Sequence, residues 1–132
     1  WGIDPHGAAS TKIAISPRNG LPPRYTLWQK TVGTNLSWLA RPSIDISNRT
    51  VLVVDDIYDE GHTLAAICEY LKEAGAKKVY AAALLNKVHD RKVDYVPDFI
   101  GLDVEDRFVY GFGMDYQGYF RNVDGIYAVK DM

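Results

Sequence analysis

The chain has 132 residues, of which 47% are hydrophobic and 24% charged, and its formal net charge is -2 at pH 7. This length favours one compact domain, and the charge excludes the basic surface of a typical nucleic-acid-binding protein. The lone Cys68 excludes an intramolecular disulfide framework, and no apolar run approaches the roughly 20 residues of a membrane helix. We therefore expect a soluble, cytoplasmic protein that binds no nucleic acid and no membrane.

The first third of the chain has few clear elements. Residues 1–23 are rich in Gly, Pro, Ser and Asn, and only the alternating patch Lys12–Ile15 predicts a strand. Trp1 is followed by no charged and then apolar leader, which indicates neither a signal peptide nor an initiator methionine and leaves open that the natural chain begins earlier. Residues 24–39 are typical of a flexible excursion that ends in a strand around residues 36–39.

The middle of the chain predicts a strand, a helix and a second strand. The apolar run Val51–Val54 is typical of a strand buried in a parallel sheet, and residues 79–85 form the next such strand. Between them a helix is expected, with Thr63 as its cap and Gly75 at its end. Three more short strands are expected at residues 98–101, 108–112 and 126–129. The sequence thus predicts an α/β fold with a mainly parallel sheet flanked by helices.

The first strand of this unit is followed by four carboxylates and a glycine, which are Asp55, Asp56, Asp59, Glu60 and Gly61. Ligands of open α/β sheets bind at the carboxyl ends of the strands. Gly61 lets backbone N–H groups turn toward an anion at the helix N-terminus, where His62 and Thr63 can also donate. Asp55 and Asp56 suit sugar hydroxyls or a metal, because ionised carboxylates only accept hydrogen bonds. Acidic residues can also simply complement a helix dipole, but four of them before a Gly-x-Thr turn favour a phosphate site.

The stretch VLVVDDIYDEGHTL resembles the phosphoribosyl-pyrophosphate motif of the type I phosphoribosyltransferases. The resemblance implies that Asp55 and Asp56 hold the ribose hydroxyls, that the loop from Glu60 to Thr63 surrounds the 5′-phosphate, and that Asp59 is the general acid/base. The run PDFIGLDVEDRFVYGFGMDYQGYFRNVDGIYAV is similar to the hypoxanthine-guanine branch of that family.

This second resemblance implies the remaining site residues. They are Phe108 stacked on the base, Val109 with its backbone at the base edge, Asp115 near the metal and Arg121 on pyrophosphate, together with Lys87, at the end of the strand residues Leu84-Leu85-Asn86-Lys87, on the purine 6-oxo group. Arg24-Tyr25 followed by Thr31-Val32-Gly33 is similar to the mobile loop of the family, which implies that Tyr25 shields the reaction. The resemblance also implies Mg²⁺ as the cofactor and a homodimer or homotetramer. The expected reaction is purine salvage, in which phosphoribosyl pyrophosphate and hypoxanthine or guanine give the nucleoside monophosphate and pyrophosphate.

Residues 1–23 do not match this family, because the strand, pyrophosphate loop and helix expected there are not found. We therefore expect one domain over residues 1–132 whose start is truncated or rearranged. Two alternatives stay open. A non-catalytic regulator of the same fold would bind phosphoribosyl pyrophosphate or a nucleotide without releasing pyrophosphate. VLVVDD with Asp103 also resembles a response-regulator receiver domain, although too few residues follow Asp103 for the two further β-α units of a receiver.

Overall fold

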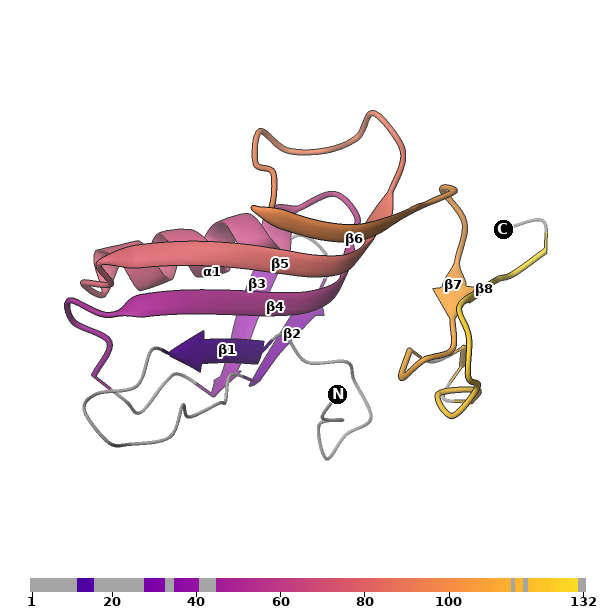
Figure 1. Ribbon diagram of the computed structural model, residues 1–132, viewed down its shortest axis with the longest axis horizontal. Helices are drawn as coiled ribbons and strands as arrows, with labels where there is room; N and C mark the ends of the chain where they lie inside the picture. Colours follow the sequence, from indigo (N-terminus) through magenta and orange to yellow (C-terminus); the bar gives the residue numbers. More distant parts are fainter. Residues whose placement is uncertain are drawn as a thin grey trace.

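A four-stranded sheet with the strand order β1-β4-β5-β6 forms the centre of the protein (Figure 1). The computed structural model describes residues 45–114, 116–117 and 119–130 in full, and residues 12–15, 28–32 and 35–40 by their backbone. The four strands are β1 (Lys12–Ile15), β4 (Thr50–Tyr58), β5 (Lys78–Lys87) and β6 (Phe99–Val104). β4, β5 and β6 are parallel, and β1 pairs with β4 in the antiparallel sense. The predicted α/β fold with a mainly parallel sheet is confirmed.

Helix α1 (His62–Glu73) connects β4 to β5 and packs on both strands through its apolar face, which is formed by Leu64, Ile67, Cys68 and Leu71. Its end is as predicted, since Gly75 has a φ of 97°. Its start differs. Gly61 is the N-cap and no side chain caps the helix, so the cap predicted at Thr63 is wrong. In the part of the chain that the structure describes, no helix is long and apolar enough to cross a membrane.

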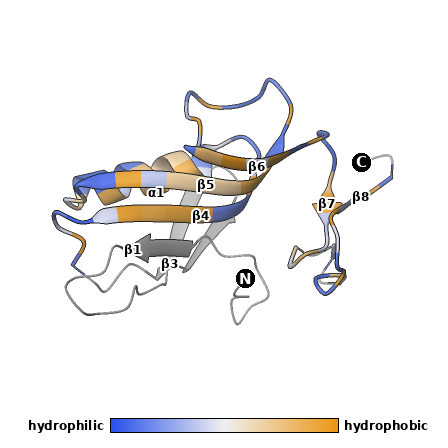
Figure 2. Cartoon of the chain, in the orientation of Figure 1, coloured by the Kyte–Doolittle hydropathy of each residue, from blue (hydrophilic) through white to orange (hydrophobic). Residues whose placement is uncertain are grey.

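Strand β4 is longer than the predicted run Val51–Val54. Its ladder with β5 continues as far as the pair Tyr58 and Asn86, which keeps the backbone extended through the acidic residues. Asp55 and Asp56 therefore lie within the strand, and the connection to α1 consists of residues 59–61 alone. Figure 2 shows the same change, because β4 is hydrophobic along most of its length and hydrophilic toward its carboxyl end.

Two small antiparallel pairs accompany the sheet. β2 (Trp28–Val32) pairs with β3 (Asn35–Ala40), and only the second of these strands was expected. β7 (Val109–Tyr110) pairs with β8 (Tyr127–Ala128), and both are shorter than predicted. β7 ends early because Gly111 and the following residue have positive φ angles of 94° and 51°, which turn the chain out of the extended conformation.

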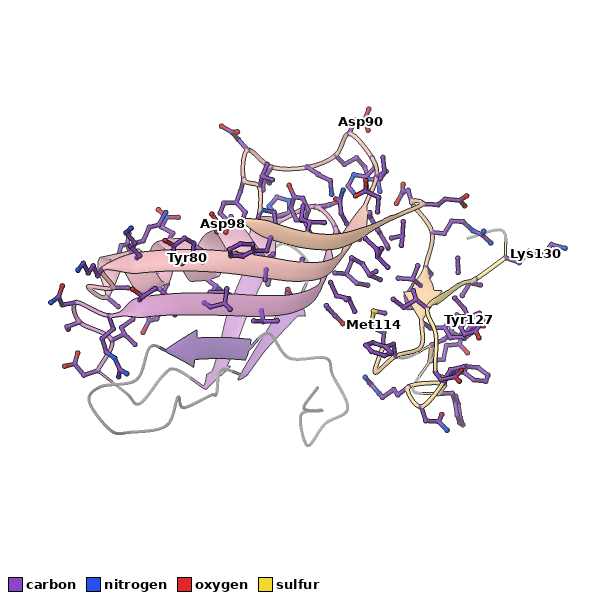
Figure 3. The ribbon with its side chains drawn as sticks, viewed as in Figure 1. Tyr80, Asp90, Asp98, Met114, Tyr127 and Lys130 are labelled. Atoms are coloured by element: carbon purple, nitrogen blue, oxygen red, sulfur yellow. The ribbon has the colours of Figure 1, made fainter. Side chains whose placement is uncertain are left out.

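The β7–β8 pair lies beside the carboxyl ends of the parallel strands (Figures 1 and 3). Val109 and Met114 are buried against Leu85 of β5, with Ile57 of β4 packed on the same cluster. In Figure 3 the Met114 side chain points toward the sheet from this side. This small apolar cluster fixes the C-terminal part of the chain next to the strand ends where a site is expected.

Candidate functional site

The two adjacent aspartates of β4 are each oriented by the backbone of the next residue. The N–H of Asp56 donates to Asp55 Oδ1 at 2.9 Å, and the N–H of Ile57 donates to Asp56 Oδ1 at 2.8 Å. Both aspartates are partly buried near the carboxyl end of the strand. The structure thus places them within the strand and not after it as predicted, and their contact with ribose stays a prediction.

The turn before α1 has the features of an anion site. No side chain caps α1 and no acidic residue lies in its first turn, so the N–H groups of that turn and the helix dipole favour a bound anion. Gly61 has a φ of 91°, and a Cβ there would lie 2.8 Å from the Tyr58 ring and 3.2 Å from Val93. The turn therefore requires glycine. On its outer side, His62 Nε2 lies 3.3 Å from Glu60 Oε2, with both side chains about half exposed.

Asp59 follows β4 and is in contact with two residues from the end of β5. Its Oδ2 lies 3.3 Å from Lys87 Nζ, and its Oδ1 lies 2.7 Å from His89 Nε2. Partial burial raises the pKa of Asp59, but the hydrogen bond from His89 and the charge of Lys87 together hold that pKa below its ordinary value. Asp59 is therefore a carboxylate at neutral pH, which is the form that accepts a proton. The predicted base and the predicted purine-contacting lysine lie side by side.

The C-terminal residues predicted to contact the purine lie around β7. Phe108 is 42% exposed, and its ring meets Tyr116 edge to face at a centroid distance of 5.6 Å. Val109 is buried at 5% exposure and pairs with Ala128 of β8, and its contact with the base edge stays a prediction. Arg121 Nη1 donates to the carbonyl of Gly113 at 3.1 Å. Two predicted site residues, Tyr25 and Asp115, lie outside the described residues.

The segment of residues 89–95, which follows β5, contacts the turn before α1 and was missed by sequence reasoning. Two hydrogen bonds join the two: Lys92 Nζ donates to the Asp59 carbonyl at 2.7 Å, and the N–H of Val93 donates to the Glu60 carbonyl at 2.9 Å. Next to the turn, the hydroxyl of Tyr58 at the end of β4 donates to the Tyr95 carbonyl. Lys92 Nζ also lies 3.8 Å from the centroid of the Tyr58 ring. His89 had a weak sequence signal, since it lies two residues beyond Lys87 at the end of the same strand.

Asp59, His89 and Asp106 place one possible metal-ligand atom each within 4.8 Å of the others. Both carboxylates already have cationic partners, because Lys87 contacts Asp59 and Arg91 forms a bidentate ion pair with Asp106 at 2.8 and 3.0 Å. Two positive side chains at such short range oppose a bound cation. This arrangement is therefore an ion-pair network that links the ends of β4, β5 and β6.

A comparison with known protein families identifies the chain. The family model described as phosphoribosyl transferase domain matches residues 10–117. The chain belongs to this phosphoribosyl transferase family. The match agrees with the resemblance in the strand–turn–helix region, and it makes the receiver-domain alternative wrong. It begins at residue 10, so residues 10–23 do match the family, contrary to the expectation from the sequence.

Individual relatives agree with this assignment to the phosphoribosyl transferase family. The chain is 41% identical over 88 residues to a hypoxanthine-guanine phosphoribosyltransferase of Aquifex aeolicus, covering 67% of this chain and 49% of the relative. It is 37% identical over 86 residues to the protein of that name from Canis lupus familiaris, covering 65% and 39%. The crystal structure of a hypoxanthine-guanine phosphoribosyltransferase from Bacillus anthracis superposes with a TM-score of 0.72 at 28% identity, over 78% of this chain and 64% of that one. The chain thus spans half or less of the length of these two curated relatives.

Proposed function

We propose that this chain transfers the 5-phosphoribosyl group of phosphoribosyl pyrophosphate to a 6-oxopurine such as hypoxanthine or guanine, in purine salvage. The observation that carries the proposal is the contact between Asp59 and Lys87 at 3.3 Å, beside the uncapped N-terminus of α1. This contact joins Asp59, which lies next to the turn expected to bind phosphate, to Lys87, which is expected to contact the base. The names of the relatives from Aquifex aeolicus and Canis lupus familiaris support the same activity.

The sugar phosphate is assigned to the end of β4 and the turn that follows. The 5′-phosphate lies on residues 60–63, where the N–H groups of the first turn of α1 and the side chains of His62 and Thr63 can donate to it. The ribose hydroxyls donate to Asp55 and Asp56. Since both of these carboxylates accept from the following backbone N–H, they are held in fixed orientations before the sugar arrives.

The reaction replaces one bond at C1′ of the ribose by another. A purine ring nitrogen attacks C1′, the C1′–O bond to pyrophosphate breaks, and its electron pair leaves with the pyrophosphate. The purine proton passes from N7 to the Asp59 carboxylate, and general-base catalysis of this kind contributes roughly 10²–10⁴-fold. Arg121 stabilises the negative charge of the departing pyrophosphate, and Tyr25 shields the reaction from water.

The purine is assigned to the ends of β5 and β7. The Lys87 side chain is 13% exposed and donates to the 6-oxo group. A 6-amino group donates where a 6-oxo group accepts, so Lys87 disfavours adenine. The exposed ring of Phe108 stacks on the base, and the backbone of Val109 contacts the base edge.

Magnesium is the cofactor that we propose. The carboxylates of Asp55 and Asp56 fit this metal, because Mg²⁺ prefers hard oxygen ligands and is commonly bound through one or two carboxylates together with substrate phosphates. Asp115 is the further residue that we assign to it. When bound, magnesium neutralises negative charge on the pyrophosphate.

We further propose that the protein is a cytoplasmic homodimer or homotetramer with a single domain over residues 1–132. The lone cysteine supports a reducing compartment. Edge strand β6 supports self-association, since Phe99 and Leu102 are more than half exposed and an apolar strand edge is commonly covered by a partner. Light scattering after size-exclusion chromatography measures the oligomeric state.

The proposed activity is tested by incubating the full chain with phosphoribosyl pyrophosphate, Mg²⁺ and one of hypoxanthine, guanine, xanthine or adenine. We expect a nucleoside monophosphate and an equal amount of pyrophosphate from 6-oxopurines, with little product from adenine. Omitting Mg²⁺ is the control for the metal. Binding of phosphoribosyl pyrophosphate without release of pyrophosphate would instead support the non-catalytic regulator.

A further inference from the structure

His89 has a fixed tautomer. Its side chain is 4% exposed, and its Nδ1 accepts the backbone N–H of Arg91 at 3.1 Å. The ring proton of the neutral imidazole therefore lies on Nε2, which donates to Asp59 Oδ1 at 2.7 Å. A backbone amide thus fixes the imidazole, and the imidazole contacts the carboxylate.

The two oxygens of Asp59 have different partners. Oδ1 accepts from His89 at 2.7 Å, whereas Oδ2 lies at the longer distance of 3.3 Å from Lys87. Under the proposed function Lys87 turns toward the base, so His89 is the side-chain partner that remains during the reaction. The Asp59 side chain is 46% exposed and follows the end of β4, where free rotation would take its carboxylate away from the purine.

The geometry points to His89 as the positioning residue of the proposed base: its Nε2–H holds Asp59 Oδ1 and so presents Oδ2 to the purine proton. This inference rests on the proposed function, in which Asp59 is the base. Positioning matters because a displacement of about 1 Å at a reacting group can cost roughly 10²-fold in rate. A neutral donor suits the task, since a second full positive charge at this distance would weaken Asp59 as a base.

The other charged groups around Asp59 come from β5, the 89–95 segment, the residues after β6 and the turn before α1. Lys87 lies on β5. Lys92 binds the main-chain oxygen of Asp59 and not its carboxylate. Arg91 and Asp106 form an ion pair with each other, and Glu60 faces His62. Of these groups only Lys87 also contacts the carboxylate of Asp59 through a hydrogen bond that the structure records, so the effect of His89 can be separated by substitution.

The first experiment compares His89→Leu, which has no donor, with His89→Gln, whose amide nitrogen can occupy the place of Nε2. For His89→Leu we expect kcat to fall about 10- to 100-fold, with little change in KM for phosphoribosyl pyrophosphate. We also expect the acidic limb of its kcat–pH profile to move to higher pH, and His89→Gln to restore most of both losses. An unchanged rate and profile in His89→Leu, or equal loss in both variants, would overturn the inference. If His89→Leu does not fold, His89→Asn replaces it, because the shorter amide cannot reach Asp59 Oδ1.

A second measurement separates this inference from the proposed function. The carboxyl carbon of Asp59 is titrated by NMR in the wild type, His89→Leu and His89→Gln, which requires no turnover. A titration midpoint that rises in His89→Leu and returns in His89→Gln supports the hydrogen bond, even if the chain makes no nucleotide. An active chain in which this midpoint is the same in all three proteins would contradict the positioning role and leave the proposed function intact.

Discussion

Asp59 accepts hydrogen bonds at three oxygens, two on its side chain and one on its main chain, from His89, Lys87 and Lys92. These donors come from the end of β5 and the segment after it, whereas Asp59 itself follows β4. His89 and Lys87 keep the pKa of Asp59 low despite partial burial, so the carboxylate is ionised and oriented. At the residue scale the site is therefore organised around one carboxylate.

We predict that Asp59→Asn lowers kcat by about 10²–10⁴-fold with little change in KM for phosphoribosyl pyrophosphate. The amide keeps the shape of the side chain but is a poor base and offers one acceptor where two donors converge. Steady-state kinetics measure the effect. Asp90→Asn is the matched control, because Asp90 is exposed at the loop between β5 and β6 (Figure 3). Equal kcat in Asp59→Asn and the wild type would remove Asp59 from the mechanism.

Lys87→Met should weaken the use of the purine base more than the use of phosphoribosyl pyrophosphate. Loss of a hydrogen bond from a charged group costs about 1.5–3 kcal/mol, so kcat/KM for hypoxanthine should fall roughly 10- to 150-fold. The preference for hypoxanthine over adenine should fall with it, as measured by competition between the two bases. Lys78→Met at the exposed start of β5 serves as the control. If Lys87→Met keeps the preference of the wild type, another residue distinguishes the 6-position.

At the element scale, the strands and the helix with a local hydrophobic pattern were predicted from the sequence. Features that depend on contacts between residues far apart in the chain were missed. The apolar run of β4 and the helical spacing of α1 predicted the β-α-β unit. The extension of β4 to Tyr58 depends on its pairing with β5, which no local pattern encodes. The aspartates, the turn and Lys87 were predicted by motif, and Asp59 and Lys87 indeed lie in contact. His89, Lys92 and Val93 were missed because ordinary loop composition does not reveal hydrogen bonds between residues 30 or more positions apart.

The turn before α1 allows a test at this scale. Gly61→Ala should destabilise the fold by about 1–3 kcal/mol, because it forces an L residue to a φ of 91° and places its Cβ 2.8 Å from Tyr58. It should also weaken binding of phosphoribosyl pyrophosphate, which calorimetry measures directly. Gly75→Ala is the control, since its φ is 97° but its nearest neighbour, Ser47, is at an ordinary 3.6 Å. Both variants should melt earlier, and only Gly61→Ala should lose affinity. Equal affinity in the two variants would contradict a phosphate site at this turn.

At the scale of the whole molecule, three weakly acidic side chains, two tyrosines and one cysteine, connect a strand, a helix and a loop at the core. Tyr58 ends β4, Cys68 lies on α1 and Tyr95 lies in the 89–95 segment, with Cys68 Sγ 3.1 Å from the Tyr95 hydroxyl. Burial raises the pKa of all three groups, and for Tyr95 the neighbouring Cys68 raises the pKa further. The folded state thus holds these protons more tightly than the unfolded chain does.

This predicts loss of stability in alkali. The contribution is complete below the pKa values of the unfolded groups, about 8.5 for cysteine and 10 for tyrosine, and it is lost as pH rises through the higher values of the folded state. Tm should therefore fall above about pH 9, as measured by scanning calorimetry. Tyr95→Phe should make this fall shallower, whereas Tyr127→Phe, at an exposed position, should leave it unchanged. A Tm that stays level through this range would contradict the prediction.

The hydrogen bonds between the 89–95 segment and the turn before α1 connect the two halves of the proposed substrate site. The segment begins two residues after the lysine assigned to the base, and the N–H of Val93 donates to the main-chain oxygen of Glu60 in the turn assigned to the phosphate. A ligand that stiffens either loop therefore stiffens the other. Because such linkage is thermodynamically reciprocal, each substrate should increase the affinity for its companion by the same factor. Positive cooperativity between phosphoribosyl pyrophosphate and the purine would then arise from main-chain hydrogen bonds and would require no direct contact between the two ligands.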